Sequence, residues 1–331
     1  MTMKEYRIQN GEVSISEACR RASERMRGAT RMNVELGSVS VSDNVLSVDG
    51  EIVANMDDFA WSLFAGLLNI PTPYLMRLGS RMRAANVEYW LDMYKDKQVS
   101  MVVKDMELVE LVDGAEVSQS DILDILNKVV PDGIMLRAFN QTNSVVWDVV
   151  DVRKVHVGKY DTYFHGMRVV VKKGLNAPEV SPIFVSENSC GIIECADCFD
   201  RLNIKSMTYG DILRLVSERM VDCLMCADSL FEAFKRIESE EVPYPKRRVT
   251  LYCREHGISD RVKSYAVNCL DEARLRSTSY GNIIGLFSTI GFFDEVKQSS
   301  ERKLQKLAGH IITKARTESR CSACDSLEVE V

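Results

Sequence analysis

The sequence contains no apolar run that approaches the roughly 18 residues needed to span a bilayer as a helix. Its N-terminus lacks the apolar stretch of a secretory signal. Also absent are the glycine-rich phosphate loop of nucleotide enzymes, the His-Glu-x-x-His pair of zinc proteases and the Gly-x-Ser-x-Gly turn of serine hydrolases. The four histidines are scattered. These absences predict a protein of a reducing cytoplasm with no membrane segment and no cofactor, and they favour a non-enzymatic role.

The chain does contain enough apolar side chains for a sizeable core. Of its 331 residues, 46% are hydrophobic and 27% are charged, which is ordinary for a globular protein. The length permits one large domain or two ordinary ones. A net charge of -6 argues against a protein that coats duplex DNA over its whole surface. A local basic site remains compatible with this charge, because binding depends on the field at the site.

The order of the predicted elements indicates an α+β fold. Residues 133–201 are rich in Val, Ile, Phe and Tyr, with Gly and Asn breaks, which predicts three to five antiparallel strands. From about residue 207 the apolar residues follow helical spacing. We therefore expect a central antiparallel sheet with helices packed on it in residues 1–242. A helical C-terminal part over 243–316 packs on it, or belongs to the same domain, and a polar acidic tail covers 317–331.

Local signals predict individual elements. Two alternating runs flank Asp49-Gly50, which is a strong hairpin signal. A short helix is expected after Ser118 or Ser120, either of which can serve as its N-cap. Apolar residues at helical spacing predict one long helix over 211–236.

The stretch 152–174 concentrates positive charge and aromatic rings in this acidic chain. The valine alternation slips by one residue at Arg153-Lys154, which predicts a β-bulge there. A cationic surface with aromatic faces is what binders of single-stranded nucleic acid use. The predicted contacts are Arg153, Lys154, Lys159, Arg168, Lys172 and Lys173 for phosphates, with Tyr160 and Tyr163 for base stacking. The alternative is a solvated sheet face whose aromatic residues pack in the core.

Motifs in several segments give the chain a family resemblance. Residues 68–91 contain an Ile-Pro-x-x-Tyr-Leu-x-x-Leu segment and then an Asn-x-x-x-Trp-Leu helix. A Ser/Asn-rich strand ending in glycine follows at 185–191, and 280–311 holds a helix pair with a Leu-Ala-Gly motif. In this order the motifs resemble the phage/plasmid-like proteins grouped as domain of unknown function 932. The Arg201-Leu202 pair also fits, although "RLNIKSMTYGD" replaces the family's usual Cys-x-Asn-Gly segment. The resemblance implies a phage, prophage or plasmid origin. It does not supply a mechanism, because the family has none assigned.

Three Cys-x-x-Cys pairs are present, at Cys195/Cys198, Cys223/Cys226 and Cys321/Cys324. Two such pairs can build a four-thiolate zinc site. However, Cys223 lies on the apolar stripe of the predicted long helix, where cysteine behaves as a small hydrophobic residue. We therefore expect Cys223 and Cys226 to be buried and reduced, with zinc as the alternative. The third pair lies in the polar tail and is expected to be exposed and redox-active, or unstructured.

The residues favour a phage- or plasmid-derived accessory protein that binds or anneals single-stranded DNA in replication or recombination. Single-stranded nucleic acid is the expected partner, and homo-oligomerisation is left open. One alternative is a virion or host-interaction protein that binds no nucleic acid. Another is a metal-dependent, nuclease-like enzyme. Its magnesium would need carboxylates such as Asp148, Asp151, Glu194, Asp197 and Asp200.

Overall fold

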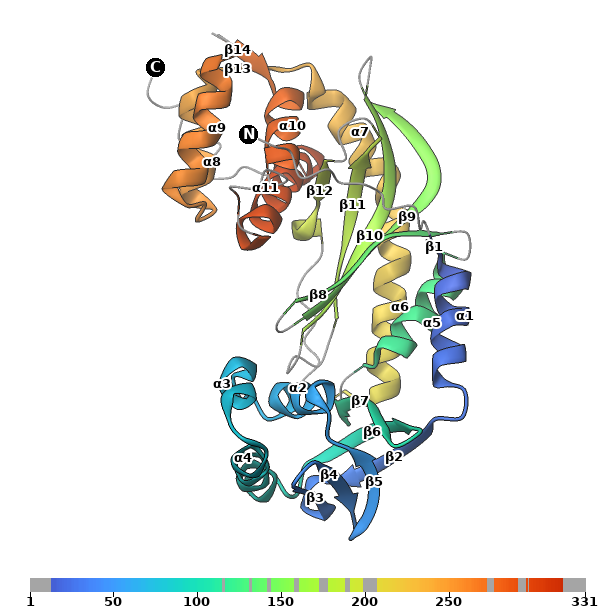
Figure 1. Cartoon of the computed structure of the whole chain (residues 1–331). Coiled ribbons are helices and arrows are strands. Elements are labelled where there is room, and N and C mark those ends of the chain that lie inside the picture. Colours follow the sequence, from blue (N-terminus) through green and yellow to red (C-terminus); the bar gives the residue numbers. More distant parts are fainter. Residues whose placement is uncertain are drawn as a thin grey trace.

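The computed structural model describes residues 13–114, 117–130, 133–141, 144–157, 161–172, 178–187, 191–198, 207–272, 277–290, 296 and 298–317. Two six-stranded sheets with helices packed on them form an α+β fold, as predicted. Figure 1 shows the first sheet in a lower body and the second sheet, with the C-terminal helices, in an upper body. The prediction of one central sheet therefore missed the sheet of the lower body.

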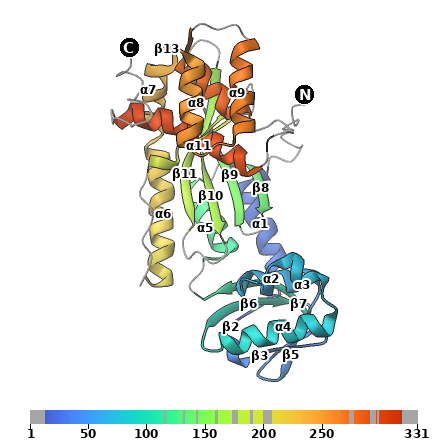
Figure 2. The ribbon, with the colours of Figure 1, turned by 90° about the vertical axis from the view of Figure 1, so that its left-hand side faces the viewer.

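The lower body is a mixed sheet covered by three helices. Its strand order is β2-β6-β7-β5-β4-β3, and only β5 and β7 pair in parallel among the described strands. The strands are β2 (Thr30–Glu35), β3 (Val39–Ser42), β4 (Val45–Val48), β5 (Glu51–Asn55), β6 (Gln98–Lys104) and β7 (Glu107–Asp113), with the short helix η1 (Leu36–Ser38) after β2. The helices are α2 (Asp58–Leu67), α3 (Thr72–Arg77) and α4 (Ser80–Met93). Figure 2 shows α4 lying across the strands.

The hairpin predicted at Asp49-Gly50 is confirmed as the β4–β5 turn. Both residues have positive φ angles, 50° and 82°, as a two-residue hairpin turn of the primed type requires. The core of this body forms between the sheet and its helices, with Trp61 and Phe64 of α2 and Leu91 of α4 at most 2% exposed.

The upper sheet is antiparallel in all its pairings, which confirms the predicted strands of the middle third. Its order is β1-β8-β9-β10-β11-β12. The strands are β1 (Val13–Ser14), β8 (Ile134–Gln141), β9 (Ser144–Val157), β10 (Asp161–Lys172), β11 (Glu179–Ser186) and β12 (Ile192–Glu194).

The predicted irregularity in β9 is present, but it covers residues 151–153 instead of Arg153-Lys154. Phe164 of β10 pairs with Lys154, but Gly166 pairs with Val150, so the segment 151–153 lies opposite a single β10 residue. Only glycine fits at position 166, because a Cβ there would lie 2.0 Å from the carbonyl oxygen of Val149.

Helices cover both halves of this twisted sheet. These are α1 (Ile15–Met26), α5 (Gln119–Val129), α6 (Tyr209–Met225), α7 (Ala227–Glu238), α8 (Pro245–Glu255), α9 (Asp260–Glu272), α10 (Tyr280–Ile290) and α11 (Gln298–Thr317), with a small β13–β14 ribbon (Glu241–Pro243 and Ser277–Ser279). Ser118 caps α5 in a capping box with Asp121, which selects one of the two predicted caps. The C-terminal helices share one core with sheet residues such as Phe184.

The single long helix predicted over 211–236 is wrong, because it breaks at Cys226 into α6 and α7. The two helices pack on different parts of the sheet. Val216 of α6 shares a core with Met167, whereas Phe234 of α7 shares one with Tyr163. One straight helix does not follow a sheet that twists by about 20–25° per strand. Within the described residues, no helix is long and apolar enough to cross a membrane.

Candidate functional site

Two of the predicted nucleic-acid contacts lie inside the protein. The side chain of Arg168 is 2% exposed and that of Tyr163 is 5% exposed. The Tyr163 ring packs on Phe234 of α7, with ring centroids 5.4 Å apart. Neither side chain reaches the surface, so the prediction is wrong for these two residues. Tyr163 instead follows the alternative in which the aromatic residue packs in the core.

The other predicted contacts stay predictions. The backbones of Arg153 and Lys154 lie in β9, and Lys172 ends β10. The side chains of these three residues, and the whole of Lys159, Tyr160 and Lys173, lie outside the described part of the chain.

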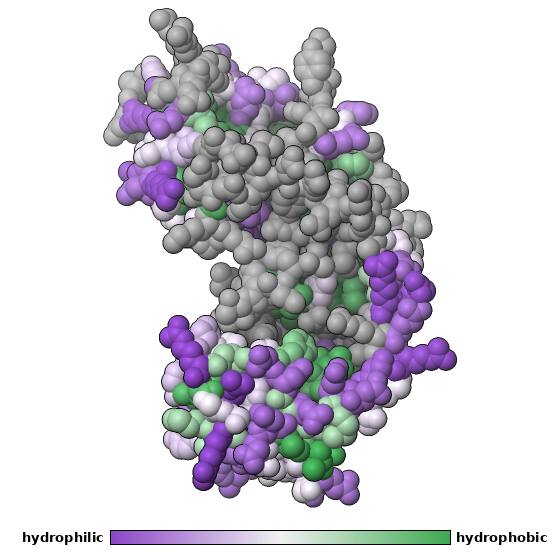
Figure 3. Space-filling model, viewed as in Figure 1, coloured by the Kyte–Doolittle hydropathy of each residue, from purple (hydrophilic) through white to green (hydrophobic). Residues whose placement is uncertain are grey.

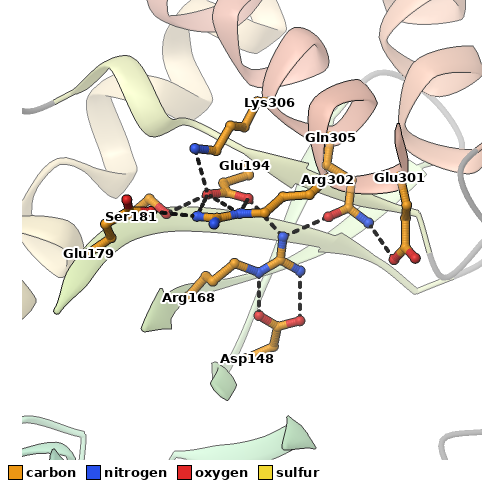
Figure 4. A network of polar contacts seen from close by, with 9 residues as sticks. All are labelled: Asp148, Arg168, Glu179, Ser181, Glu194, Glu301, Arg302, Gln305 and Lys306. Atoms are coloured by element: carbon orange, nitrogen blue, oxygen red, sulfur yellow. Dashed lines mark hydrogen bonds and ion pairs between the residues drawn. The ribbon is translucent and has the colours of Figure 1, made fainter. Parts of the chain in front are cut away.

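Arg168 lies in a row of polar side chains that crosses the upper sheet (Figure 4). Its strand neighbours are Asp148 on β9 and Ser181 on β11. The guanidinium donates to Asp148 from Nε at 2.6 Å and from Nη2 at 2.7 Å, and Nη1 donates to Glu194 at 2.8 Å. The Ser181 hydroxyl donates to the other oxygen of Glu194 at 3.0 Å. The two buried carboxylates therefore surround one buried guanidinium.

Helix α11 closes this network from above the sheet. The Gln305 side-chain oxygen accepts from Nη1 of Arg168 at 2.7 Å. Arg302 donates to Glu194 from Nη2 at 2.8 Å and from Nε at 3.1 Å. The network therefore ties α11 to four strands, β9 to β12, and its role is structural.

The positive and negative side chains of the network stabilise each other's ionised forms. Burial alone would raise the pKa of Glu194, but the guanidinium groups of Arg168 and Arg302 outweigh burial and lower that pKa to about 2. Burial likewise opposes the charge of Arg168, and the carboxylates of Asp148 and Glu194 raise its pKa above the ordinary value. Glu194, Arg168 and Arg302 are therefore charged at neutral pH.

This arrangement predicts an acid-sensitive fold. The native pKa of Glu194 is about 2, below the value of about 4.3 expected in the unfolded chain. The unfolded state therefore binds the proton first, and the stability that Glu194 contributes above about pH 5 is lost as the pH falls toward about 2. Urea unfolding measured between these pH values checks this. Glu194→Gln is expected to show a weaker pH dependence, whereas Glu218→Gln, on an exposed face of α6, is expected to keep that of the wild type.

Three of the five carboxylates named for the magnesium alternative are already engaged with cationic or histidine side chains. Asp148 and Glu194 are occupied by arginine, and Asp197 lies 2.6 Å from Nδ1 of His310. Asp151 is half-buried in β9, and Asp200 lies outside the described residues. In the part of the chain that the structure describes, no group of three or more His, Cys, Asp or Glu side chains is arranged to hold a metal ion.

The thiols of the first two Cys-x-x-Cys pairs are free and differ in access to solvent. Cys195 and Cys223 are 0% exposed, and this confirms that Cys223 is buried. Cys226 was predicted to be buried as well, but it is only half-buried, like Cys198.

The lower body carries an open groove that we consider the best candidate site. Its volume is about 580 Å³, within the range of ligand pockets. It is lined by Asn69, Ile70, Pro71, Tyr74, Met82, Ala85, Asn86, Tyr89 and Trp90. Apolar side chains reach the surface of this body in Figure 3. The groove is therefore a mainly apolar surface with two amide side chains.

The groove exists because α4 has two apolar faces. Its inner face buries Ala84, Val87 and Leu91 against the sheet. The outer face carries Met82 and Tyr89, which are 65% and 62% exposed. An amphipathic surface helix normally keeps this second face polar. An exposed apolar stripe therefore marks a contact surface.

Aromatic rings dominate this outer face. Trp90 stacks on Tyr94 one turn later, with ring centroids 6.0 Å apart and planes 14° from parallel. Tyr89 meets Trp90 edge-on at 5.6 Å. Across the groove Tyr74 is 50% exposed, and its hydroxyl oxygen accepts from the Asn86 amide at 3.3 Å. Aromatic rings and amide groups are thus both exposed in this groove.

Residues 59–87, which hold most of the groove lining, are basic, whereas Glu88 and Asp92 add negative charge farther along α4. This span contains Arg77, Arg81 and Arg83 and no Asp or Glu. Arg77 and Arg81 are exposed. Arg83 is structural, because its guanidinium lies over the Trp61 ring and donates to the carbonyls of Met76 and Leu78. Two exposed cations therefore accompany the aromatic surface.

Comparison with protein-family models, curated proteins and solved structures finds no match to this chain. The proposed relation to the phage/plasmid-like family therefore rests on the motifs themselves. In the structure, one of these motifs lies at the groove. Ile70, Pro71 and Tyr74 of its first part line the groove together with Asn86 and Trp90 of its second part.

The sequence singled out this motif without assigning a site to it. Met82 and Tyr89 were not predicted as functional residues. The signal that identifies them is the second apolar stripe of α4, which has the same helical spacing as the buried one.

Proposed function

We propose that the protein is an accessory protein of phage or plasmid origin that binds single-stranded nucleic acid, with bases stacked in the groove between α3 and α4. The supporting observation is that the exposed rings of Tyr74 and Tyr89 line a groove whose two helices, α3 and α4, also carry the exposed Arg77 and Arg81. Stacking platforms combined with cations are the common basis of single-strand binding. Asn69 and Asn86 add groups that hydrogen-bond base edges.

The biological setting follows from the same proposal. Binding or annealing of single-stranded DNA serves replication or recombination, in the cytoplasm of a host cell. The basic residues of the β9–β10 hairpin, Arg153 and Lys154 above all, are proposed as further phosphate contacts. An annealing protein must hold two strands, so self-association is expected and is measured by size-exclusion chromatography with and without an oligonucleotide.

Tyr89→Ala tests the groove directly. The variant is expected to bind a single-stranded oligonucleotide at least about fivefold more weakly, because stacking contributes roughly 1–3 kcal/mol per base. Fluorescence anisotropy with a labelled single strand and a matched duplex measures this, and the wild type should prefer the single strand. The control is Met225→Ala at the end of α6, which removes a side chain that is 77% exposed outside the groove.

The arginines are tested by salt dependence. Each phosphate contact contributes roughly 0.7 to the slope of log affinity against log salt for a single strand. Replacing Arg77 and Arg81 together with alanine is expected to reduce the slope by about 1.4. Arg254→Ala on α8, whose side chain is 67% exposed, is the charge control. If the wild type binds no oligonucleotide at low salt, the groove is a protein-docking surface and the virion or host-interaction alternative holds.

A further inference from the structure

One edge of the lower sheet presents backbone groups that can pair with another strand. Strand β2 ends this sheet and pairs only with β6 among the described strands. The Leu36 N–H donates to the carbonyl of Lys97 at 2.9 Å, which shows which positions of β2 bond toward β6. Hydrogen-bonded positions alternate along an antiparallel pair. The backbone N–H and C=O groups of Arg31, Asn33 and Glu35 therefore point away from β6.

The other sheet edges are short or covered. In the upper sheet the outermost strands β1 and β12 have two and three residues. At the far edge of the lower sheet, β3 has four residues, and the outward N–H of Val41 donates to the Glu88 carboxylate of α4. Such features protect an edge strand from pairing with another chain. Strand β2, by contrast, has six residues without a proline or a register shift, and four of them are exposed.

The residues of β2 are complementary to a second copy of the same strand. When two copies pair antiparallel around a two-fold axis at Asn33, Arg31 of each copy lies opposite Glu35 of the other. Met32 then lies opposite Val34, on the face where both side chains pack against the core of the lower body. Opposite charges and apolar pairs that face each other across two strands stabilise a sheet. Shifting the register by two residues in either direction removes both ion pairs, so the register at Asn33 is favoured.

Neither charged side chain is held strongly within its own chain. Arg31 is 45% exposed and lies 3.6 Å from Glu110 of β7, which is too long for a hydrogen bond. Glu35 is exposed and accepts one side-chain hydrogen bond, from the Gln98 amide at 2.9 Å. Exposed ion pairs contribute little to the stability of a fold. Arg31 and Glu35 can therefore turn toward a second copy at a small cost.

We propose that the protein forms a two-fold dimer in which the β2 strands of two copies pair antiparallel and join the two lower sheets. Arg31 and Glu35 of opposite copies, and the two Asn33 residues, each exchange both of their backbone hydrogen bonds. A two-fold contact between identical edges is closed, so assembly ends at two chains. The contact uses no residue of the groove lining. The dimer therefore forms without nucleic acid and does not rest on the function proposed above.

Charge reversal tests this register on the full chain, without nucleic acid. Sedimentation velocity should show a wild-type dimer that dissociates on dilution. Arg31→Glu places two glutamates opposite each other, and Glu35→Arg places two arginines opposite each other. Each variant alone should therefore raise the dimer dissociation constant at least about tenfold. The charge-reversal control is Arg214→Glu on α6, whose side chain is 70% exposed, and it should leave the constant unchanged.

An equal mixture of the two β2 variants should restore the wild-type dissociation constant. In the mixed dimer the chain with two acidic side chains faces the chain with two basic ones, so both ion pairs form again. Energy transfer between a donor label on one variant and an acceptor label on the other measures this. Asn33→Pro should also weaken the dimer, because it removes an outward N–H that the β2–β6 ladder does not use.

Several results would overturn the proposal. These are a wild type that stays monomeric at every concentration, a wild-type assembly larger than two chains, a dimer that both charge-reversed variants retain, or a mixture that associates no better than either variant alone. Restoration in the mixture is measured on the same two variants, so a loss of fold cannot imitate the expected result. Loss of the dimer leaves the groove proposal intact, because Tyr89→Ala and the oligonucleotide measurements test that proposal separately.

Discussion

Arg168→Met is expected to destabilise the protein by about 3–5 kcal/mol, the cost of removing one partner from a buried ion pair. The side chains of Arg168, Asp148 and Glu194 are at most 2% exposed. Methionine fills most of the volume but removes the guanidinium from Asp148, and it leaves Glu194 with Ser181 and the contacts from α11. The loss appears in urea unfolding, followed by circular dichroism and by the fluorescence of the buried Trp147.

Arg214→Met is the matched control for this substitution. Arg214 on α6 is 70% exposed and forms surface ion pairs with Asp211 and Glu218 at 3.7 Å and 3.5 Å. Such pairs contribute about 0–1 kcal/mol. Equal effects of the two substitutions would contradict the structural role that we assign to the buried network.

Gly309→Ala is expected to cost about 3 kcal/mol, the upper part of the usual range for overpacking. The added methyl group would meet backbone atoms at the end of β12 and just after it, namely the carbonyl carbon of Glu194 at 2.5 Å and the nitrogen of Cys195 at 2.7 Å. Backbone cannot rotate away as a flexible side chain does, so α11 must shift. That shift would also stretch the contacts of Arg302 and Gln305. The midpoint of thermal unfolding and the urea midpoint measure the effect.

Gly285→Ala on α10 provides the control, because nothing lies within 4 Å of its added Cβ. At an open helical site alanine is favoured over glycine by roughly 0.5–1 kcal/mol. The two glycine substitutions should therefore change stability in opposite directions. A neutral Gly309→Ala would mean that α11 adapts to the methyl group without loss of packing.

Local signals predicted local structure well. Alternation, the Asp49-Gly50 turn and the Ser118 cap depend on neighbouring residues, so the sequence is sufficient to infer them. Strand pairing is different. Arg168 was predicted to contact phosphate, and Asp148 was considered only as a magnesium ligand in an alternative interpretation, yet the register places them side by side. A sequence shows two opposite charges 20 residues apart, but it does not show which strand positions face each other.

The groove was missed for a related reason. Helical spacing identifies an apolar stripe, but it does not tell which of two stripes is buried. Only the packing of α4 on the sheet shows that Val87 faces inward and Tyr89 outward. Part of the lining also comes from the segment around Ile70, before α3, and its approach to α4 depends on the turn at Asn69, where φ is 55°.

The position of the lower body in the chain has a consequence for how the protein is built. Residues 30–113 lie between α1 and α5, and these two helices run antiparallel, with Ser16 bonded to Asn127 and Cys19 to the carbonyl of Leu123. The end of α1 is therefore next to the start of α5. A segment whose two ends are neighbours can be exchanged or removed without cutting the remaining core. The aromatic groove is carried on an insertion, and a short loop from α1 to α5 could replace it while the charge network of the upper sheet stays whole.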